Sequence, residues 1–372
     1  MSETEIPQPD RVEGAPHPRE TVRLFGQDRA EQDFLTAYTT GRLHHGWLLT
    51  GPRGLGKATL AWRIARFLLA TPEQEDDGLF GAPAPPDTLE IGTDHPVMRR
   101  TLALSEPGLF LLRRAWDDKA KRLKTQLTVD EVRKLKGFFT LSSAEGGRRV
   151  VIVDSMDELN TSAANAILKL LEEPPARTTL LMVAHQPSRL LPTIRSRCRE
   201  LRLAPLDTED MARALGQAGA EVAATDAQAL AALSSGSVGA AMRLLNHDGL
   251  KLYADLVHTV GTLPRLDRPR AIALVDSTAG KANEARLDLT LTLMDTLLAR
   301  LARTGVTGAP PTPEAAPGEA AMLARLSPDP ATGRAWAQLA QEAGDRARHA
   351  RAVNVDPAAL VLDLILQLHK VA

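Results

Sequence analysis

The stretch GPRGLGK at residues 51–57 decides how this sequence of 372 residues is expected to fold. Two glycines and a lysine at this spacing are typical of a phosphate-binding loop, in which backbone N–H groups surround an anion. A short apolar strand is expected before it at 47–49, and apolar side chains at helical spacing follow it over 60–68. Strand, loop and helix in this order predict a nucleotide-binding α/β domain. The alternative is a glycine-rich turn before a core helix.

Individual residues of the loop determine what it is expected to do. Gly51, Gly54 and Gly56 allow backbone N–H groups to converge on phosphates, and Lys57 adds a positive charge. In a hydrolysing loop the next residue is Ser or Thr, whose hydroxyl holds Mg²⁺, but here it is Ala58. The loop is therefore predicted to be a degenerate nucleotide site with weakened support for the metal.

A second acidic segment follows the buried strand predicted at 150–154. Asp154 ends this strand and is expected to belong to the nucleotide site. In hydrolysing proteins of similar architecture the next residue is a glutamate that prepares the attacking water, but here it is Ser155, a poor base at neutral pH. Asp157 and Glu158 are interpreted as solvent-facing acids before the next helix. The site is predicted to turn nucleotide over poorly, which leaves open whether ATP or ADP occupies it.

Composition is that of an ordinary globular protein. The chain is 44% hydrophobic and 24% charged, and 45 basic against 46 acidic residues give a net charge of −1, so no overall attraction to nucleic acid or membrane is expected. The single cysteine, Cys198, excludes an intrachain disulfide. Because no run approaches about 18 apolar residues, and the first 20 residues lack an apolar core, we expect a cytoplasmic protein without membrane contact.

The pattern of elements changes along the chain. Residues 1–20 are polar and proline-rich and are predicted to form a disordered tail. Strands alternate with helices over 21–204, which predicts a three-layer α/β domain around the phosphate loop. Beyond it no strand pattern remains. Residues 205–254 are predicted to form a small helical domain, and 255–372 a helical C-terminal domain whose last helix begins at Asp356.

Three stretches resemble one known family: GRLHHGWLLTGPRGLGKATLA, VVIVDSMDELNTSAANAILKLLEEPP and LLPTIRSRC. Together they resemble bacterial clamp-loader subunits of the AAA+ superfamily, over roughly residues 24–204. The resemblance implies an AAA+ P-loop domain, a helical lid and a collar of C-terminal helices. It also implies that Arg197, in the Ser-Arg-Cys triplet, is an arginine finger that projects toward ATP bound by a neighbouring subunit.

This family contains motor subunits that hydrolyse ATP and a member that does not. The losses at Ala58 and Ser155, with Arg197 retained, favour the second kind. The lid motif of motors, Gly-Ser-x-Arg, reads GSVG at 236–239 and lacks its arginine. We therefore expect a clamp-loader subunit of DNA polymerase III without ATPase activity of its own. The alternatives are an active motor ATPase and a small-molecule P-loop kinase; for the arginine, the alternative is an ion pair with an acid such as Glu200.

The resemblance also implies partners and cofactors. The partners would be the ATPase motor subunits and the delta subunit of the clamp loader and, through the assembly, the sliding clamp and primer–template DNA. Many family members carry a four-cysteine zinc module, which this sequence lacks, so no zinc is expected. His44, His45 and His95 are accordingly interpreted as ordinary polar residues. The basic stretch 113–124 is interpreted as a solvated hairpin, with contact to DNA phosphates as the alternative.

Overall fold

The computed structural model describes residues 7–71, 85–141, 147–223, 225–278, 280, 283–353 and 355–372. The chain forms two compact units. Unit 1 comprises Met1–Ala218 and Ser237–Gly239, and unit 2 comprises Gly219–Gly236 and Ala240–Ala372. The division predicted at residues 205 and 254 is a different one and stays a prediction.

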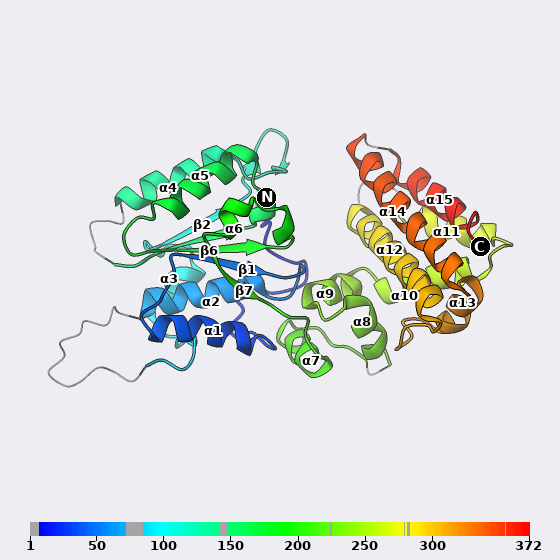
Figure 1. Cartoon of the computed structure of the whole chain (residues 1–372), viewed down its shortest axis with the longest axis horizontal. Coiled ribbons are helices and arrows are strands. Elements are labelled where there is room, and N and C mark those ends of the chain that lie inside the picture. The colour runs from blue at the N-terminus through cyan, green and yellow to red at the C-terminus, as the bar shows by residue number, and fades with distance from the viewer. Residues whose placement is uncertain are drawn as a thin grey trace, which may run out of the picture. The chain divides into compact units, whose positions relative to one another are not determined.

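Unit 1 is built on a five-stranded parallel sheet in the order β2-β5-β6-β1-β7 (Figure 1). The strands predicted at 47–49 and 150–154 are confirmed, as is the strand that the apolar run at 179–184 predicts, and each extends slightly further than predicted. Strands β1 and β6 are buried throughout, as expected for a parallel sheet covered on both faces. The strands are β1 (Gly46–Thr50), β2 (Leu109–Arg113), β5 (Arg149–Asp154), β6 (Thr178–Ala184) and β7 (Arg199–Arg202).

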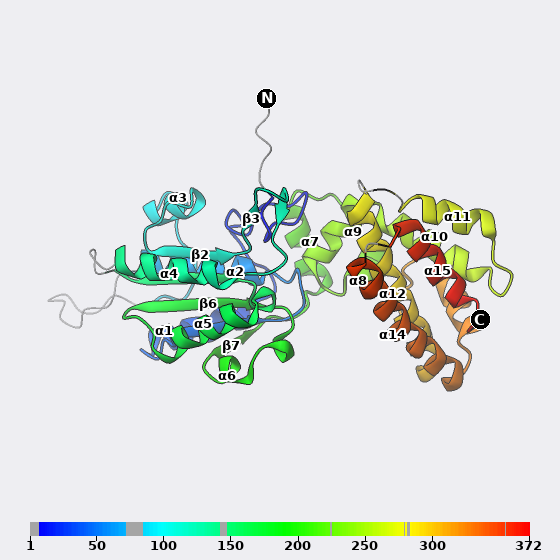
Figure 2. The same ribbon diagram turned by 90° about the horizontal axis from the view of Figure 1, so that it is seen from above.

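Helices cover both faces of this sheet, which confirms the predicted three-layer α/β fold. Helices α4 (Val129–Leu141) and α5 (Thr161–Glu172) lie side by side on one face, and α1 (Asp28–Thr39) and α2 (Lys57–Ala70) lie on the other (Figures 1 and 2). The sequence predicts that Asn160 or Thr161 begins this helix, and the structure shows that it is Asn160, whose side chain accepts a hydrogen bond of 2.9 Å from the N–H of residue 163.

The rest of unit 1 consists of short elements. The predicted hairpin is confirmed, with β3 (Trp116–Asp117) antiparallel to β4 (Arg122–Leu123). The acidic, proline-rich stretch 71–95 is predicted from its composition to be exposed; its residues 72–84 lie outside the described residues, and Leu89 is buried. The remaining elements are the helices α3 (Pro96–Leu102), α6 (Pro192–Arg195) and α7 (Thr208–Gln217), and the single 3-10 turns η2 (Met156–Glu158) and η3 (Pro187–Arg189).

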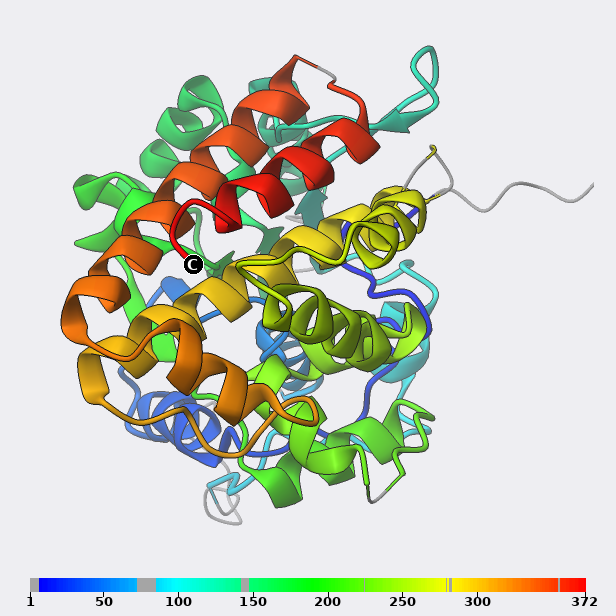
Figure 3. The same ribbon diagram turned by 90° about the vertical axis from the view of Figure 1, so that its right-hand side faces the viewer.

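In the described residues of unit 2 all the secondary structure elements are helices, joined by loops. Its two longest helices, α12 (Glu284–Thr307) and α14 (Pro330–Ala352), pack along each other (Figure 3). Asp356 begins the last helix as predicted, through a hydrogen bond of 3.0 Å from the N–H of residue 359. In the described part of the chain no helix is long and apolar enough to cross a membrane. The other helices are α8 (Ala227–Ser234), α9 (Val238–Asn246, whose first two residues belong to unit 1), α10 (Gly249–Gly261), α11 (Arg268–Asp276), α13 (Glu319–Leu326) and α15 (Pro357–Leu368).

A buried carboxylate fixes the proline-rich segment between α12 and α13. Glu319 is fully buried and accepts hydrogen bonds from Arg300 Nε at 2.6 Å and from the N–H of Ala315 at 2.7 Å. The hydroxyl of Tyr253, on α10, also donates to it. The segment is therefore held by a satisfied ionic network inside unit 2.

Candidate functional site

The phosphate loop follows the carboxyl end of β1 and leads into α2, as predicted. Gly51, Gly54 and Gly56 have φ angles of 136°, 80° and 90°, which residues with a side chain rarely adopt. Lys57 is the first residue of α2 and is 3% exposed. Its Nζ donates hydrogen bonds to the carbonyl oxygens of Gly51, at 2.6 Å, and Pro52. The lysine thus closes the loop on its own backbone.

Two buried groups of opposite charge face each other at this site. Burial lowers the pKa of Lys57 to about 8, and the carboxylate of Asp154 opposes that shift. Asp154 ends β5; burial, and then the carboxylate of Asp10, raise its pKa to about 7. The structure thus brings together the two residues that the sequence analysis placed in one site. At neutral pH, in the absence of a bound cation, a large fraction of Asp154 is protonated.

The two positions where hydrolytic groups were found missing lie in this site. Ala58 is the second residue of α2, directly after the lysine. Ser155 follows Asp154 and is 2% exposed, and its hydroxyl has no hydrogen-bond partner among the described residues. Neither residue supplies a carboxylate or a metal-binding hydroxyl to the loop.

Asp157 and Glu158 are not the solvent-facing acids that we expected from the sequence. Both are half-buried. Asp157 accepts hydrogen bonds from the backbone N–H groups of His185, at 2.6 Å, and Gln186, at 2.8 Å, directly after β6. Glu158 forms an ion pair of 2.8 Å with Arg114 Nε, at the end of β2. The two acids therefore tie the carboxyl ends of neighbouring strands together.

His185 is a site residue that the sequence analysis missed. It follows β6, the strand beside β1, and its buried Nδ1 has no hydrogen-bond partner among the described residues. Burial lowers its pKa to about 4, and the charges of Lys57 and Arg53 add to the shift. A neutral imidazole therefore stands near the phosphate-loop lysine. Its place at the carboxyl end of a strand next to β1 is the signal that could have identified it.

Residues 7–20, which we call the N-terminal arm, pack on the protein, so the predicted disordered tail is wrong for them. The side chain of Asp10 is 1% exposed and forms ion pairs with Arg113 Nη1 at 2.8 Å and with His17 Nε2 at 3.0 Å. Burial pushes the pKa of Asp10 upward, but these two partners hold it below its usual value. Arg113, the partner of Asp10, lies in register with Asp154 on the neighbouring strand, so the arm lies against the candidate nucleotide site.

The segment at 236–239 lies directly on the phosphate loop. Ser237 Oγ donates a hydrogen bond of 2.8 Å to the carbonyl of Arg53, and the N–H of Gly239 donates one of 3.1 Å to the carbonyl of Gly54. A Cβ at residue 239 would lie 2.8 Å from the Cα of Gly54 and 3.7 Å from a methyl group of Val12. Only glycine fits between the loop and the arm without a shift of backbone.

Arg197 lies at the opposite end of β1 from the loop. Its carbonyl oxygen is 3.3 Å from where a Cβ of Gly46, the first residue of β1, would stand. The five residues from there to Gly51 span about 16 Å of extended strand, so the guanidinium cannot serve this chain's own loop. It is 38% exposed and forms an ion pair of 3.1 Å with Glu172, rather than with Glu200.

The cysteine and the histidines singled out in the sequence have local structural partners. Cys198 Sγ donates to the carbonyl of Ile194, and burial raises the pKa of the thiol to about 12. His95 caps α3, and His44 and His45 stack on each other with ring centroids 4.3 Å apart. Within the described ranges no cluster of three or more His, Cys, Asp or Glu side chains is placed to hold a metal ion.

Comparisons with known proteins bear on the same region. Residues 26–207 match a family described as DNA polymerase III, delta subunit. The chain is 39% identical to DNA polymerase III subunit delta' of Pseudomonas aeruginosa and 35% identical to that of Escherichia coli. These matches cover 59% and 58% of this chain and span only about three fifths of the relatives, 61% and 59% of their lengths.

Solved structures show only a weak similarity to this chain. One of them is a gamma subunit-related protein of DNA polymerase III from Thermotoga maritima, 14% identical, with a TM-score of 0.37. The likeness covers 91% of this chain and 99% of the other.

Proposed function

We propose, from the match of residues 26–207 to the DNA polymerase III delta-subunit family and the similarity to delta' subunits, that the chain acts as a non-hydrolysing, delta-prime-like subunit of a clamp loader. In this role it stands beside an ATPase motor subunit and presents Arg197 to the ATP bound there. With the motor and delta subunits it helps to place the sliding clamp on primer–template DNA in the cytoplasm.

The observation that carries the proposal is the separation of Arg197 from the phosphate loop by the length of β1. A guanidinium at this end of the strand is too far away to act on nucleotide in its own chain, but it is exposed enough to meet another. Breaking its ion pair with Glu172 costs little free energy, because both side chains are more than a third exposed. The guanidinium of Arg197 can therefore exchange Glu172 for a γ-phosphate that is bound by a neighbouring subunit.

The absence of turnover in the chain's own site is supported by four features of that site. Ala58 and Ser155 lack the groups that bind metal and activate water. Asp154 is held partly protonated by burial and by the carboxylate of Asp10. The lid segment presents Gly239, packed against the loop backbone, where a motor would present an arginine. We propose that any ATP or ADP bound here is not hydrolysed, and that zinc has no part in the function.

The test is ATP hydrolysis by a clamp loader reconstituted with this chain, motor subunits, clamp and primed DNA. Replacing Arg197→Ala is expected to slow hydrolysis at the adjacent motor site by about 10³-fold or more, as for other arginine fingers. Arg195→Ala removes an exposed arginine two residues away and is the matched control. Unchanged hydrolysis with Arg197→Ala, in an assembly of normal composition, would exclude the finger role.

A further inference from the structure

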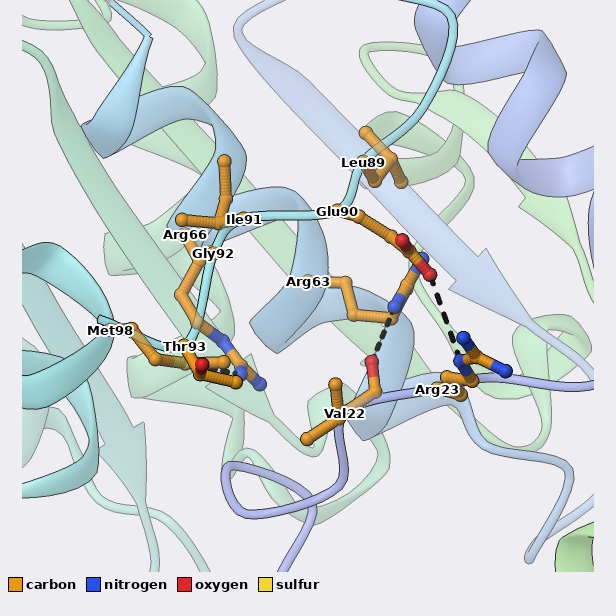
Figure 4. A pocket seen from close by; sticks show the side chains of 10 residues that line it. All are labelled: Val22, Arg23, Arg63, Arg66, Leu89, Glu90, Ile91, Gly92, Thr93 and Met98. Carbon is orange, nitrogen blue, oxygen red and sulfur yellow. Dashed lines mark hydrogen bonds and ion pairs between the residues drawn. The ribbon is translucent and has the colours of Figure 1, made fainter. Parts of the chain in front are cut away.

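A cavity that no residue of the phosphate loop lines lies beside α2 (Figure 4). Its volume is about 240 Å³, which corresponds to roughly eight water molecules at about 30 Å³ each. It is enclosed by α2, by α3 and by two loop segments, residues 22–23 and 89–93. A pocket of this size accepts a small molecule rather than a nucleotide.

Arg66 forms the innermost polar part of the wall. The residue is 3% exposed, and its contacts are with the carbonyl of Trp62 at 3.2 Å and the sulfur of Met98 at 3.0 Å. Its Nη2 has no hydrogen-bond partner among the described residues, and none of their carboxylates forms an ion pair with it. Figure 4 shows its guanidinium beside the side chains of Met98 and Thr93. One half of the guanidinium fork is left unused.

Within the part of the chain that the structure describes, Arg63, the neighbouring arginine, has an ion-pair partner, unlike Arg66. Arg63, one turn earlier on α2, forms an ion pair of 2.8 Å with Glu31 and donates to the carbonyl of Val22. Burial, and then the charge of Arg63, lower the pKa of Arg66 to about 10, so it remains charged at neutral pH. A buried cation without an anion is unfavourable, and a carboxylate matches the planar fork of a guanidinium.

The remaining walls of the cavity are mostly apolar. Val22, Leu89, Ile91 and Met98 surround the space, and an exposed ion pair between Arg23 and Glu90, at 3.9 Å, lies at its rim. A ligand that satisfies all of these walls has one carboxylate and a compact apolar body.

We propose that this cavity binds a small organic carboxylate, which accepts a hydrogen bond from Arg66 Nη2 while its apolar body packs against Leu89, Ile91 and Met98. The carboxylate can belong to a free small molecule or to an acidic side chain of a protein partner. The proposal does not depend on the clamp-loader role.

Isothermal titration calorimetry on the full chain tests it, with benzoate as the probe and benzamide as its uncharged counterpart. The Kd of benzoate is expected to be at least about tenfold lower than that of benzamide. N-acetylglutamate amide is the second probe. Tighter binding of this compound than of benzoate assigns the site to a protein side chain, and weaker binding assigns it to a free carboxylate.

Two variants connect binding to this cavity. Arg66→Met removes the cation and is expected to weaken benzoate binding about tenfold or more. Thr93→Trp fills the cavity from an exposed position, so it leaves the buried core intact and is expected to abolish binding. Thr88→Trp, at an exposed residue outside the lining, is the control. Equal affinity for benzoate and benzamide, no benzoate binding by wild type, or unchanged binding by folded Thr93→Trp each overturns the proposal.

Discussion

The two ends of strand β1 carry polar groups under opposite conditions. At the carboxyl end, Lys57 donates to the loop's own carbonyls, Asp154 is buried, and the N-terminal arm brings Asp10 against them. At the amino end, Arg197 is more than a third exposed, and its guanidinium contacts one exposed glutamate, Glu172, and the carbonyl of Thr193. The comparison indicates that charges at the first end are engaged within the chain, whereas the charge at the second end is available to another molecule.

The largest expected effect concerns the arm. Asp10→Ala leaves Arg113 and the buried His17 without their carboxylate, and breaking a buried ion pair from one side costs about 3–5 kcal/mol in the free energy of unfolding. Urea denaturation measures it, with Pro16→Ala as an exposed control in the same arm. Equal stability of Asp10→Ala and wild type would show that the arm is not bound to the site.

The next largest effect concerns Asp154, whose burial is expected to make the free energy of unfolding depend on pH. The folded pKa of Asp154, about 7, lies above its unfolded value, so its stabilising contribution is complete below about pH 4 and is lost as the pH rises through 7. Between pH 5 and pH 8 wild type loses about 2–3 kcal/mol through this group, and Asp154→Asn does not.

The measurement is the free energy of unfolding of both proteins at the two pH values. The free energy of unfolding of Asp154→Asn should increase relative to that of wild type as the pH rises, because the amide carries no charge that must be buried. Asp33→Asn, an exposed position on α1, should follow wild type. Parallel curves for Asp154→Asn and wild type would contradict the burial of a protonated carboxyl at this site.

A smaller effect on stability is expected where the segment at 236–239 packs on the phosphate loop. Gly239→Ala places a Cβ 2.8 Å from the Cα of Gly54, and overpacking of this kind costs about 1–3 kcal/mol. Gly137→Ala, in α4, makes the same gain in helix propensity with no atom within 4 Å of the added Cβ, and is the control for the steric effect. If Gly239→Ala is as stable as wild type, the segment does not need to pack directly on the loop.

The smallest effect is expected at the amino end of β1. Glu172→Gln removes the exposed partner of Arg197, and exposed ion pairs contribute about 0–1 kcal/mol. Stability should therefore be almost unchanged, and ATP hydrolysis by the reconstituted clamp loader should be retained or slightly raised. A large loss of stability would mean that this arginine has a structural role instead.

Local patterns in the sequence predicted what local interactions determine. The strand, loop and helix around Lys57 and the caps at Asn160 and Asp356 all depend on residues a few positions apart. The binding of the arm depends instead on Asp10 and Arg113, which are 103 positions apart, so no periodicity could indicate it.

The same reason explains the other errors. Asp157 was misplaced because its partners are backbone N–H groups 28 and 29 positions away. His185 was missed because its importance comes from the neighbouring strand. At residue 239 the sequence showed that an arginine is absent, but only the packing against Gly54 shows why glycine is required.

The most direct test compares two single variants in the same reconstituted clamp loader, one at each end of β1. Arg197→Ala should slow ATP hydrolysis at the adjacent motor site by about 10³-fold or more, whereas Lys57→Ala should leave hydrolysis by the assembly unchanged. The opposite pattern, hydrolysis lost with Lys57→Ala and kept with Arg197→Ala, would contradict the account.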